Sequence, residues 1–295
     1  MKVRTRESIQ GYGFMIPALV IIGVFTIIPI GYAIYLSFSR VNLLAGTSEW
    51  VGFENYRIAF TDERLMIALR NTVRYVLFVV PAQTFLALVM ASVLNSGVKF
   101  QKTFRTIYFL PTLTSSAALT MIFMFLFAVN GPVNGFLVDW GLIEAPINFI
   151  GDVNFALNTI MIMNVWSTVP FFMTIYLAGL QDIDSSLYEA AAIDGADSWK
   201  KFTKITIPNL VPVTNYVLLM GIIGCFQIFD QAFIISSGTG GPMNATLTVS
   251  LLIYQFAFQI RGTMGYAAAL AVLLAILIFV VSMITKKINK EEVIY

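Results

Sequence analysis

Histidine is absent from this chain of 295 residues, and cysteine occurs only once, as Cys225. Without histidine the chain cannot form the Ser-His-Asp or Cys-His groups of hydrolases, and it lacks the commonest metal ligand. A lone cysteine excludes an intrachain disulfide and a multi-cysteine metal site. Glycine-rich phosphate loops are also absent, so we expect no ATP on the chain itself. The sequence therefore predicts no enzyme, no catalytic residue, no metal and no cofactor in this chain.

Charge is scarce as well: charged residues make up 12% of the chain, hydrophobic residues make up 58%, and the mean hydropathy is +0.81. Six apolar runs are long enough to cross a bilayer, which takes roughly 20 residues. Because backbone groups in lipid must be paired within the segment, we predict that each run is a helix. The chain is thus predicted to be an all-α integral membrane protein, with spans at about 12–38, 73–94, 106–129, 155–180, 213–235 and 264–285.

Two apolar segments need a separate interpretation. The first run follows three basic residues, as a signal peptide would, but it exceeds the roughly 7–15 apolar residues of a signal core and no cleavage site follows. We therefore expect an uncleaved membrane helix. The stretch 245–260 is short for a span and contains Gln255 and Gln259. We predict an amphipathic helix that lies at the outer surface or dips in from it.

The basic residues indicate the orientation. Every lysine lies before the first span, between spans two and three, between spans four and five, or after span six. Loops rich in Lys and Arg stay in the cytoplasm, so both termini are predicted to be cytoplasmic. We divide the chain into residues 1–66 (cytoplasmic N-terminus, first span and an outer loop in which SEWVGFENYRIAF suggests folded structure), a five-span transport core at 67–285, and a cytoplasmic tail at 286–295.

A compact polar stretch, EAAAIDGADSWKKFTKITIP, interrupts the apolar pattern on the cytoplasmic side. A short helix is predicted before its glycine, with Ser186 and Glu189 as a capping box. Asp182 and Asp184 would lie near the helix N-terminus, where the dipole favours anions. Gly195 is suited to end this helix in a left-handed turn.

A second short helix should follow, with Asp197 or Ser198 as its cap, until Pro208 and Pro212 break the chain before span five. A well-capped cytoplasmic loop would explain these features by itself. The alternative is a rigid helix pair that docks into a partner, because small side chains around the turn let another surface approach closely. These small residues are Ala190, Ala191, Ala192 and Ala196.

The same stretch resembles the coupling loop of permease subunits in bacterial ABC importers, whose pattern is E-A-A, three residues, G, nine residues, I-x-L-P. Ile207 stands where the pattern has leucine. Four further stretches, MIPALVIIGVFTIIPIGYAIYLSFS, WVGFENYRIAF, FRTIYFLP and FDQAFIISSGTGGPMNAT, are similar to the carbohydrate-importing branch, in particular to the larger maltose permease without its extra outer domain. The residues in register are Glu189, Ala190, Ala191, Gly195, Ile205 and Pro208.

This resemblance implies a type I ABC importer permease fold in the bacterial inner membrane. It implies two ATPase subunits that carry ATP and Mg, a second homologous permease in a heterodimer, an extracellular solute-binding protein, and no nucleic acid. The cargo would be a carbohydrate, more plausibly a di- or oligosaccharide than a sugar phosphate or polyol. The loop at about 181–210 would couple the ATPase to the spans through Glu189, Ala190, Ala191, Asp194, Gly195, Ala196, Ile205 and Pro208.

Polar residues inside the spans are candidates for a substrate path, because they are costly in lipid. Span five holds one acid, flanked by two glutamines at helical spacing, and span four holds a polar stripe. Interhelical hydrogen bonds are the alternative explanation for both groups. The candidates are Gln227, Asp230 and Gln231 in span five, and Asn164, Ser167 and Thr168 in span four.

Two other function classes fit the sequence less well. A secondary transporter driven by an ion gradient usually shows inverted repeats and buried ionisable pairs, whereas this chain shows no repeat and one intramembrane acid. An intramembrane enzyme would need acid and base partners that are missing from the spans.

Overall fold

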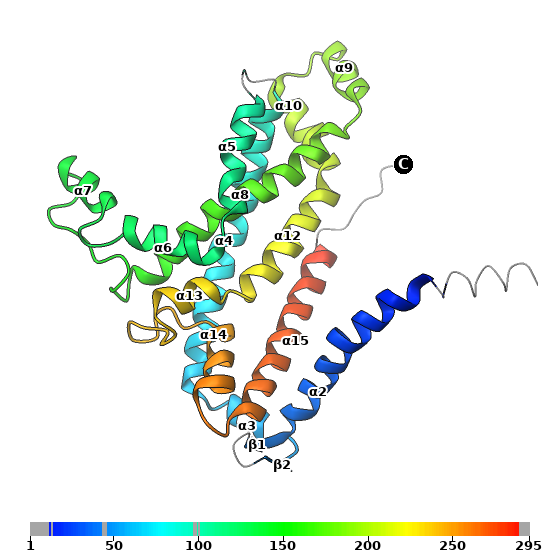
Figure 1. Cartoon of the computed structure of the whole chain (residues 1–295). Helices are drawn as coiled ribbons and strands as arrows, with labels where there is room; N and C mark the ends of the chain where they lie inside the picture. The colour runs from blue at the N-terminus through cyan, green and yellow to red at the C-terminus, as the bar shows by residue number, and fades with distance from the viewer. Residues whose placement is uncertain (1–11, 13, 43–45, 97–98, 100, 289–295) are drawn as a thin grey trace, which may run out of the picture. The chain divides into compact units, whose positions relative to one another are not determined.

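The computed structural model describes residues 12, 14–42, 46–96, 99 and 101–288 (Figure 1). The chain forms two compact units, one of residues 1–62 with 253–273 and one of residues 63–252 with 274–295. The basic residues near the two ends, Lys2, Arg4, Arg6 and Lys290, lie outside the described residues. The cytoplasmic placement of both termini therefore stays a prediction.

Five of the predicted spans are confirmed as helices long and apolar enough to cross a membrane, within the part of the chain that the structure describes. The first of them comprises a π-helical turn, Gly23–Ile27, and α2, Ile28–Ser37, at its C-terminal end. These five spans are Phe14–Ser37, α4 at Glu63–Asn95, α8 at Ala156–Gln181, Val211–Ile235, and α15 at Met264–Ile288.

The third span differs from the prediction of one continuous helix. It consists of α5, Gln101–Leu113, and α6, Ser116–Leu126, which are bent by 99° relative to each other (Figure 1). Ser115 has an extended backbone, and its side chain accepts a hydrogen bond from the Ala118 N–H at 3.3 Å. It is therefore a helix N-cap within an apolar run. The predicted count of six spans holds when α5 and α6 are counted together as one span.

The fifth span is also interrupted. Helix α12, Val211–Phe226, ends at Gln227, and α13, Asp230–Ile235, begins after Phe229, whose backbone is not helical. Gln227 and Asp230 therefore do not share one helical face. The predicted i, i+3, i+4 cluster assumed an unbroken helix and is wrong.

The core of the larger unit lies where α4 packs against α8 and α12. Gln83 of α4 is buried, and its Oε1 accepts a hydrogen bond from Thr168 Oγ1 at 2.8 Å. Gly221 of α12 faces the Gln83 amide, where a Cβ would collide with Nε2. A buried amide, a hydroxyl and a glycine thus fix this three-helix crossing, as small and polar residues commonly do in membranes.

The segment 245–260 forms a short helix as predicted, with α14 at Val249–Tyr254 and a π-helical turn at Gln255–Gln259. The segment does not lie on the outer surface as an amphipathic helix, because it packs inside the protein. Leu251, Leu252 and Gln255 are buried, and the Val249 N–H donates to Thr72 Oγ1 of α4 at 3.1 Å.

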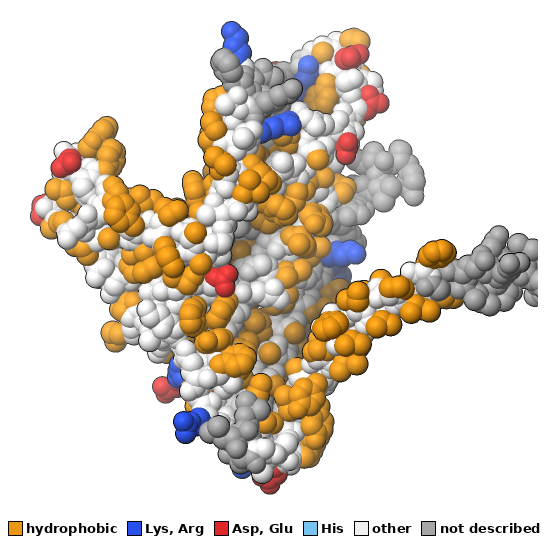
Figure 2. All heavy atoms as spheres, in the orientation of Figure 1, with side chains coloured by type: hydrophobic (Ala, Val, Ile, Leu, Met, Phe, Trp, Pro, Cys, Tyr) orange, Lys and Arg blue, Asp and Glu red, His pale blue; other side chains and the backbone are white. Residues whose placement is uncertain are grey.

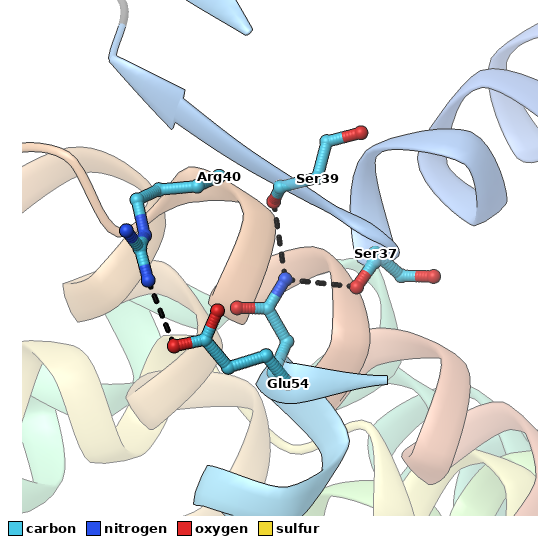
Figure 3. A network of polar contacts seen from close by, with 5 residues as sticks. Ser37, Ser39, Arg40 and Glu54 are labelled. Carbon is cyan, nitrogen blue, oxygen red and sulfur yellow. Dashed lines mark hydrogen bonds and ion pairs between the residues drawn. The ribbon is translucent and has the colours of Figure 1, made fainter. Parts of the chain in front are cut away.

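The smaller unit contains the folded outer loop that the sequence suggested. Strands β1, Ser39–Asn42, and β2, Thr47–Trp50, form an antiparallel hairpin next to α3, Glu54–Ala59. The Asn55 amide donates to the carbonyls of Ser37 and Ser39 at 2.8 and 3.1 Å (Figure 3). Arg40 pairs with Glu54 at 2.8 Å in the same view. This network joins α3 to strand β1 and to the end of the first span.

Candidate functional site

The polar stretch forms a helical hairpin, and its first arm is α9, Ser185–Ile193. The N-cap is Asp184, whose Oδ1 accepts from the Ser186 N–H at 2.9 Å, so the predicted capping box of Ser186 and Glu189 is wrong. The Ser186 backbone N–H donating to this carboxylate lowers the pKa of Asp184. Because Asp184 caps the helix, the exposed Glu189 has no capping role and its carboxylate remains available for a partner.

The turn at the tip of the hairpin confirms the role of Gly195. Its φ is +72°, and its N–H donates to the Ala192 carbonyl at 3.1 Å, while the Ala196 N–H donates to the Ala191 carbonyl at 2.8 Å. This pair of bonds is the Schellman motif, which closes a helix end on a left-handed residue. Asp197 then caps the second arm through the Lys200 N–H at 2.7 Å.

The second arm runs almost without interruption into span five. It consists of α10, Ser198–Lys201, a π-helical turn, Phe202–Thr206, and α11, Ile207–Asn209, with one non-helical residue before α12. The predicted break at Pro208 and Pro212 is confirmed in place, because the helix is interrupted at Leu210 between the two prolines, but the interruption is only one residue long. Proline has no N–H, and the wider π turn that precedes Pro208 accommodates the missing bond.

The two arms are tied together by a contact that sequence reasoning missed. Tyr188 Oη of α9 lies 2.8 Å from Thr206 Oγ1, and Thr206 is only 5% exposed. Ile193 and Trp199, in contrast, are 88% and 71% exposed near the turn. The hairpin is thus a braced element with an apolar, accessible tip.

The structure brings the predicted coupling residues together in this hairpin. Three of them lie on α9, three lie in the turn and two lie on the second arm, and four of the eight are exposed while four are half-buried. The exposed residues are Glu189, Ala190, Asp194 and Gly195, and the half-buried residues are Ala191, Ala196, Ile205 and Pro208.

A cavity of about 320 Å³, with hydroxyl and amide side chains among a largely apolar lining, lies in the larger unit, next to the bend in span three. Three of the predicted path residues line it: Ser167 and Thr168 from α8, and Gln231 from α13. The bend adds hydroxyl groups that the sequence analysis did not select. These are Thr112, Thr114, Ser116 and Thr120.

The other predicted path residues lie elsewhere. Asn164, Gln227 and Asp230 are not among the lining residues of this cavity. The Asn164 carbonyl accepts from the hydroxyls of Ser167 and Thr168 at 3.0 and 2.8 Å. Asp230 is exposed in the first turn of α13, where the helix dipole favours its charge. Thr168 therefore fits both the substrate-path explanation and the interhelical hydrogen-bond explanation, because it lines the cavity and also donates a hydrogen bond to Gln83.

No group of three or more Cys, Asp or Glu side chains that could hold a metal ion occurs within the described residues. Residues 83–291 match the family described as binding-protein-dependent transport system inner membrane component. This chain belongs to that family. It is accordingly a multi-pass inner-membrane component of an ABC transporter, a transport subunit rather than an enzyme.

Several curated relatives of this family resemble the chain over nearly its whole length. The lactose transport system permease protein LacF of Rhizobium radiobacter is 36% identical, covering 93% of this chain and 92% of its own. The multiple sugar-binding transport system permease protein MsmF of Streptococcus mutans is 32% identical, with 95% of each chain covered. The arabinooligosaccharides transport system permease protein AraP of Bacillus subtilis is 34% identical, covering 94% and 88%.

Two solved structures share the fold. A bacterial alginate ABC transporter in complex with a periplasmic protein bound to an alginate pentasaccharide contains a chain with a TM-score of 0.80 and 22% identity, covering 98% of both chains. A second structure of a bacterial alginate importer gives a TM-score of 0.77 with 22% identity, covering 99% of this chain and 98% of that one. The predicted type I ABC importer permease fold is confirmed.

Proposed function

We propose that this chain is a passive, pore-forming subunit of an ATP-driven carbohydrate importer, and that the hairpin at 181–210 transmits closure of an ATPase dimer to the spans. The observation that carries this proposal is the mechanical continuity of the hairpin with span five. The second arm meets α12 after one non-helical residue, Leu210, and the Tyr188–Thr206 contact ties the first arm to it. A braced helix moves as a body, whereas a flexible loop would absorb the displacement.

The partners in this proposal are two ABC ATPase subunits that bind ATP and Mg, a second homologous permease in a heterodimer, and an extracellular solute-binding protein. An energy source outside the chain is required because the sequence holds no phosphate-binding loop. The exposed tip around Gly195, with its small residues and the apolar Ile193 and Trp199, suits insertion into a groove of the ATPase.

The cargo in this proposal is a di- or oligosaccharide. The relatives named above transport lactose, multiple sugars or arabinooligosaccharides by their names. The cavity beside the bend of span three supports the same class, since hydroxyl and amide groups line it together with Phe171 and Phe172. Its lining residues include no lysine or arginine, which disfavours a sugar phosphate. Alternating access would open this polar region to each side in turn.

Reconstitution tests the proposal. The chain is assembled in liposomes with two ATPase subunits, the second permease and the binding protein of the same transport system. ATP hydrolysis should rise when binding protein loaded with sugar is added, and radiolabelled sugar should enter only with ATP. The chain alone should neither hydrolyse ATP nor take up sugar. Uptake by the chain alone under an ion gradient would instead establish a secondary transporter.

A further inference from the structure

An exposed aromatic pair stands on the helix that follows span three. Helix α7, Pro132–Asp139, carries Phe136, and Trp140 is its C-cap residue. The two rings are 4.7 Å apart between centroids, and the residues are 51% and 71% exposed. Leu142, just beyond the helix, is exposed as well. Such a surface in water is unfavourable, because apolar area gains about 25 cal/mol per Å² on leaving water.

The opposite side of α7 is fixed to its own loop. Asn134 is 1% exposed, and its Nδ2 donates to the carbonyls of Ala128 and Ile147, both at 2.9 Å. The Ile147 N–H donates back to Asn134 Oδ1 at 2.8 Å. Because α7 cannot turn without breaking these bonds, Phe136 and Trp140 cannot rotate into the protein.

The start of α7 is held against the end of the apolar helix α6. Gly131 packs on the last carbonyls of that helix, where a Cβ would lie 2.6 Å from the Leu126 oxygen. Its N–H donates to the Ala128 carbonyl at 2.8 Å. Helix α6 exposes Met121 and Phe125, and Figure 2 shows hydrophobic side chains over both α6 and α7 on one face. The apolar surface of the membrane helix thus continues onto α7.

We propose that α7 is an interfacial anchor whose Phe136–Trp140 face inserts into the bilayer headgroup region, on the side of the membrane opposite the lysine-rich loops. Tryptophan favours this depth, because its apolar ring meets lipid while its N–H meets water, and Phe136 adds apolar area beside it. Lipid fits better than a soluble protein partner because the aromatic face is continuous with the apolar surface of a membrane helix. The anchor thereby holds the C-terminal end of α6, the second half of the bent span three. Residues at the bend of this span line the cavity described above.

Photo-cross-linking in intact cells tests the anchor directly. The photoreactive residue p-benzoylphenylalanine is placed at position 136 or 140 in cells that produce the complete transporter. The same probe at position 199 is the matched control, since Trp199 is as exposed as Trp140 but lies on the hairpin that is predicted to face the cytoplasm. We expect adducts with radiolabelled phospholipid from positions 136 and 140, and none from position 199. Protein-sized adducts without lipid at 136 and 140 would overturn the proposal, as would no adduct at either.

Discussion

Tyr188 Oη and Thr206 Oγ1 lie 2.8 Å apart, although 18 residues separate them in the sequence. The tyrosine is on the first arm of the hairpin, and the threonine is buried in the π-helical turn of the second arm. A force applied at the tip around Gly195 therefore reaches span five through both arms.

Removing this contact should weaken coupling more than assembly. A neutral hydrogen bond contributes about 0.5–1.5 kcal/mol net. Tyr188→Phe and Thr206→Val should therefore each lower the stability of the packed hairpin by about that amount. Stimulation of ATP hydrolysis by loaded binding protein should fall in both variants, and the double variant should lose little more than either one. Thr203→Val is the matched control, since Thr203 bonds only carbonyls of its own arm. Equal losses in the control would contradict the bracing role.

The three-helix crossing in the core makes a stability prediction with an internal control. Gly221→Ala would press a methyl group onto the buried amide of Gln83, whereas Gly224→Ala on the same helix meets no atom within 4 Å. Overpacking of a core typically destabilises by about 1–3 kcal/mol. The midpoint of thermal unfolding of the purified chain should therefore fall for Gly221→Ala and stay near wild type for Gly224→Ala. Equal midpoints would show that the Gln83 side chain moves aside without a cost in stability.

The spans could be predicted from the sequence because hydropathy alone decides which segments enter lipid. Their breaks could not, because a hydropathy average carries no information on backbone direction. The 99° bend after Leu113 had two local signals: Pro111 near the end of α5, and Ser115, which suits a helix N-cap inside an apolar run. The break at residues 227–229 has no proline or glycine to indicate it.

The helical hairpin at 181–210 was predicted in position and turn because its spacing and Gly195 are local features. Its cap was misassigned because Asp184 and Ser186 are both good cap residues, and only the backbone decides between them. The bond between Tyr188 and Thr206 depends on how the two arms pack, which no local pattern encodes. The same holds for the hydroxyl groups that the bend of span three adds to the cavity.

The cavity beside the bend of span three predicts which residues affect transport without affecting assembly. Ser167→Ala and Gln231→Leu remove polar groups from its lining, so sugar uptake should fall severalfold while the complex purifies intact. Thr174→Val is the control in the same span, because Thr174 bonds only its own helix and does not line the cavity. Uptake and stimulated ATP hydrolysis are both measured in liposomes. If Gln231→Leu breaks up the complex, this residue is interhelical packing rather than path.

The tip of the hairpin offers a sharp test of coupling, because Gly141, outside the hairpin, is among the glycines that share the left-handed conformation of Gly195. Gly195 has φ +72° and Gly141, which follows α7, has φ +66°, and an added Cβ meets no atom within 4 Å at either position. A non-glycine residue in this left-handed region costs roughly 1–2 kcal/mol, so alanine should strain both turns alike. Only at Gly195 would a larger side chain also obstruct the surface that we propose meets the ATPase.

We therefore expect Gly195→Ala to reduce, and Gly195→Trp to abolish, the stimulation of ATP hydrolysis by loaded binding protein, with sugar uptake falling in parallel. Gly141→Ala and Gly141→Trp should leave both activities near wild type despite the same backbone strain. The permease should be inserted and assembled in all four variants, as shown by its yield in purified membranes. Full stimulation with tryptophan at position 195 would mean that the hairpin tip does not contact the ATPase. Equal losses at both glycines would assign the effect to backbone strain rather than to docking.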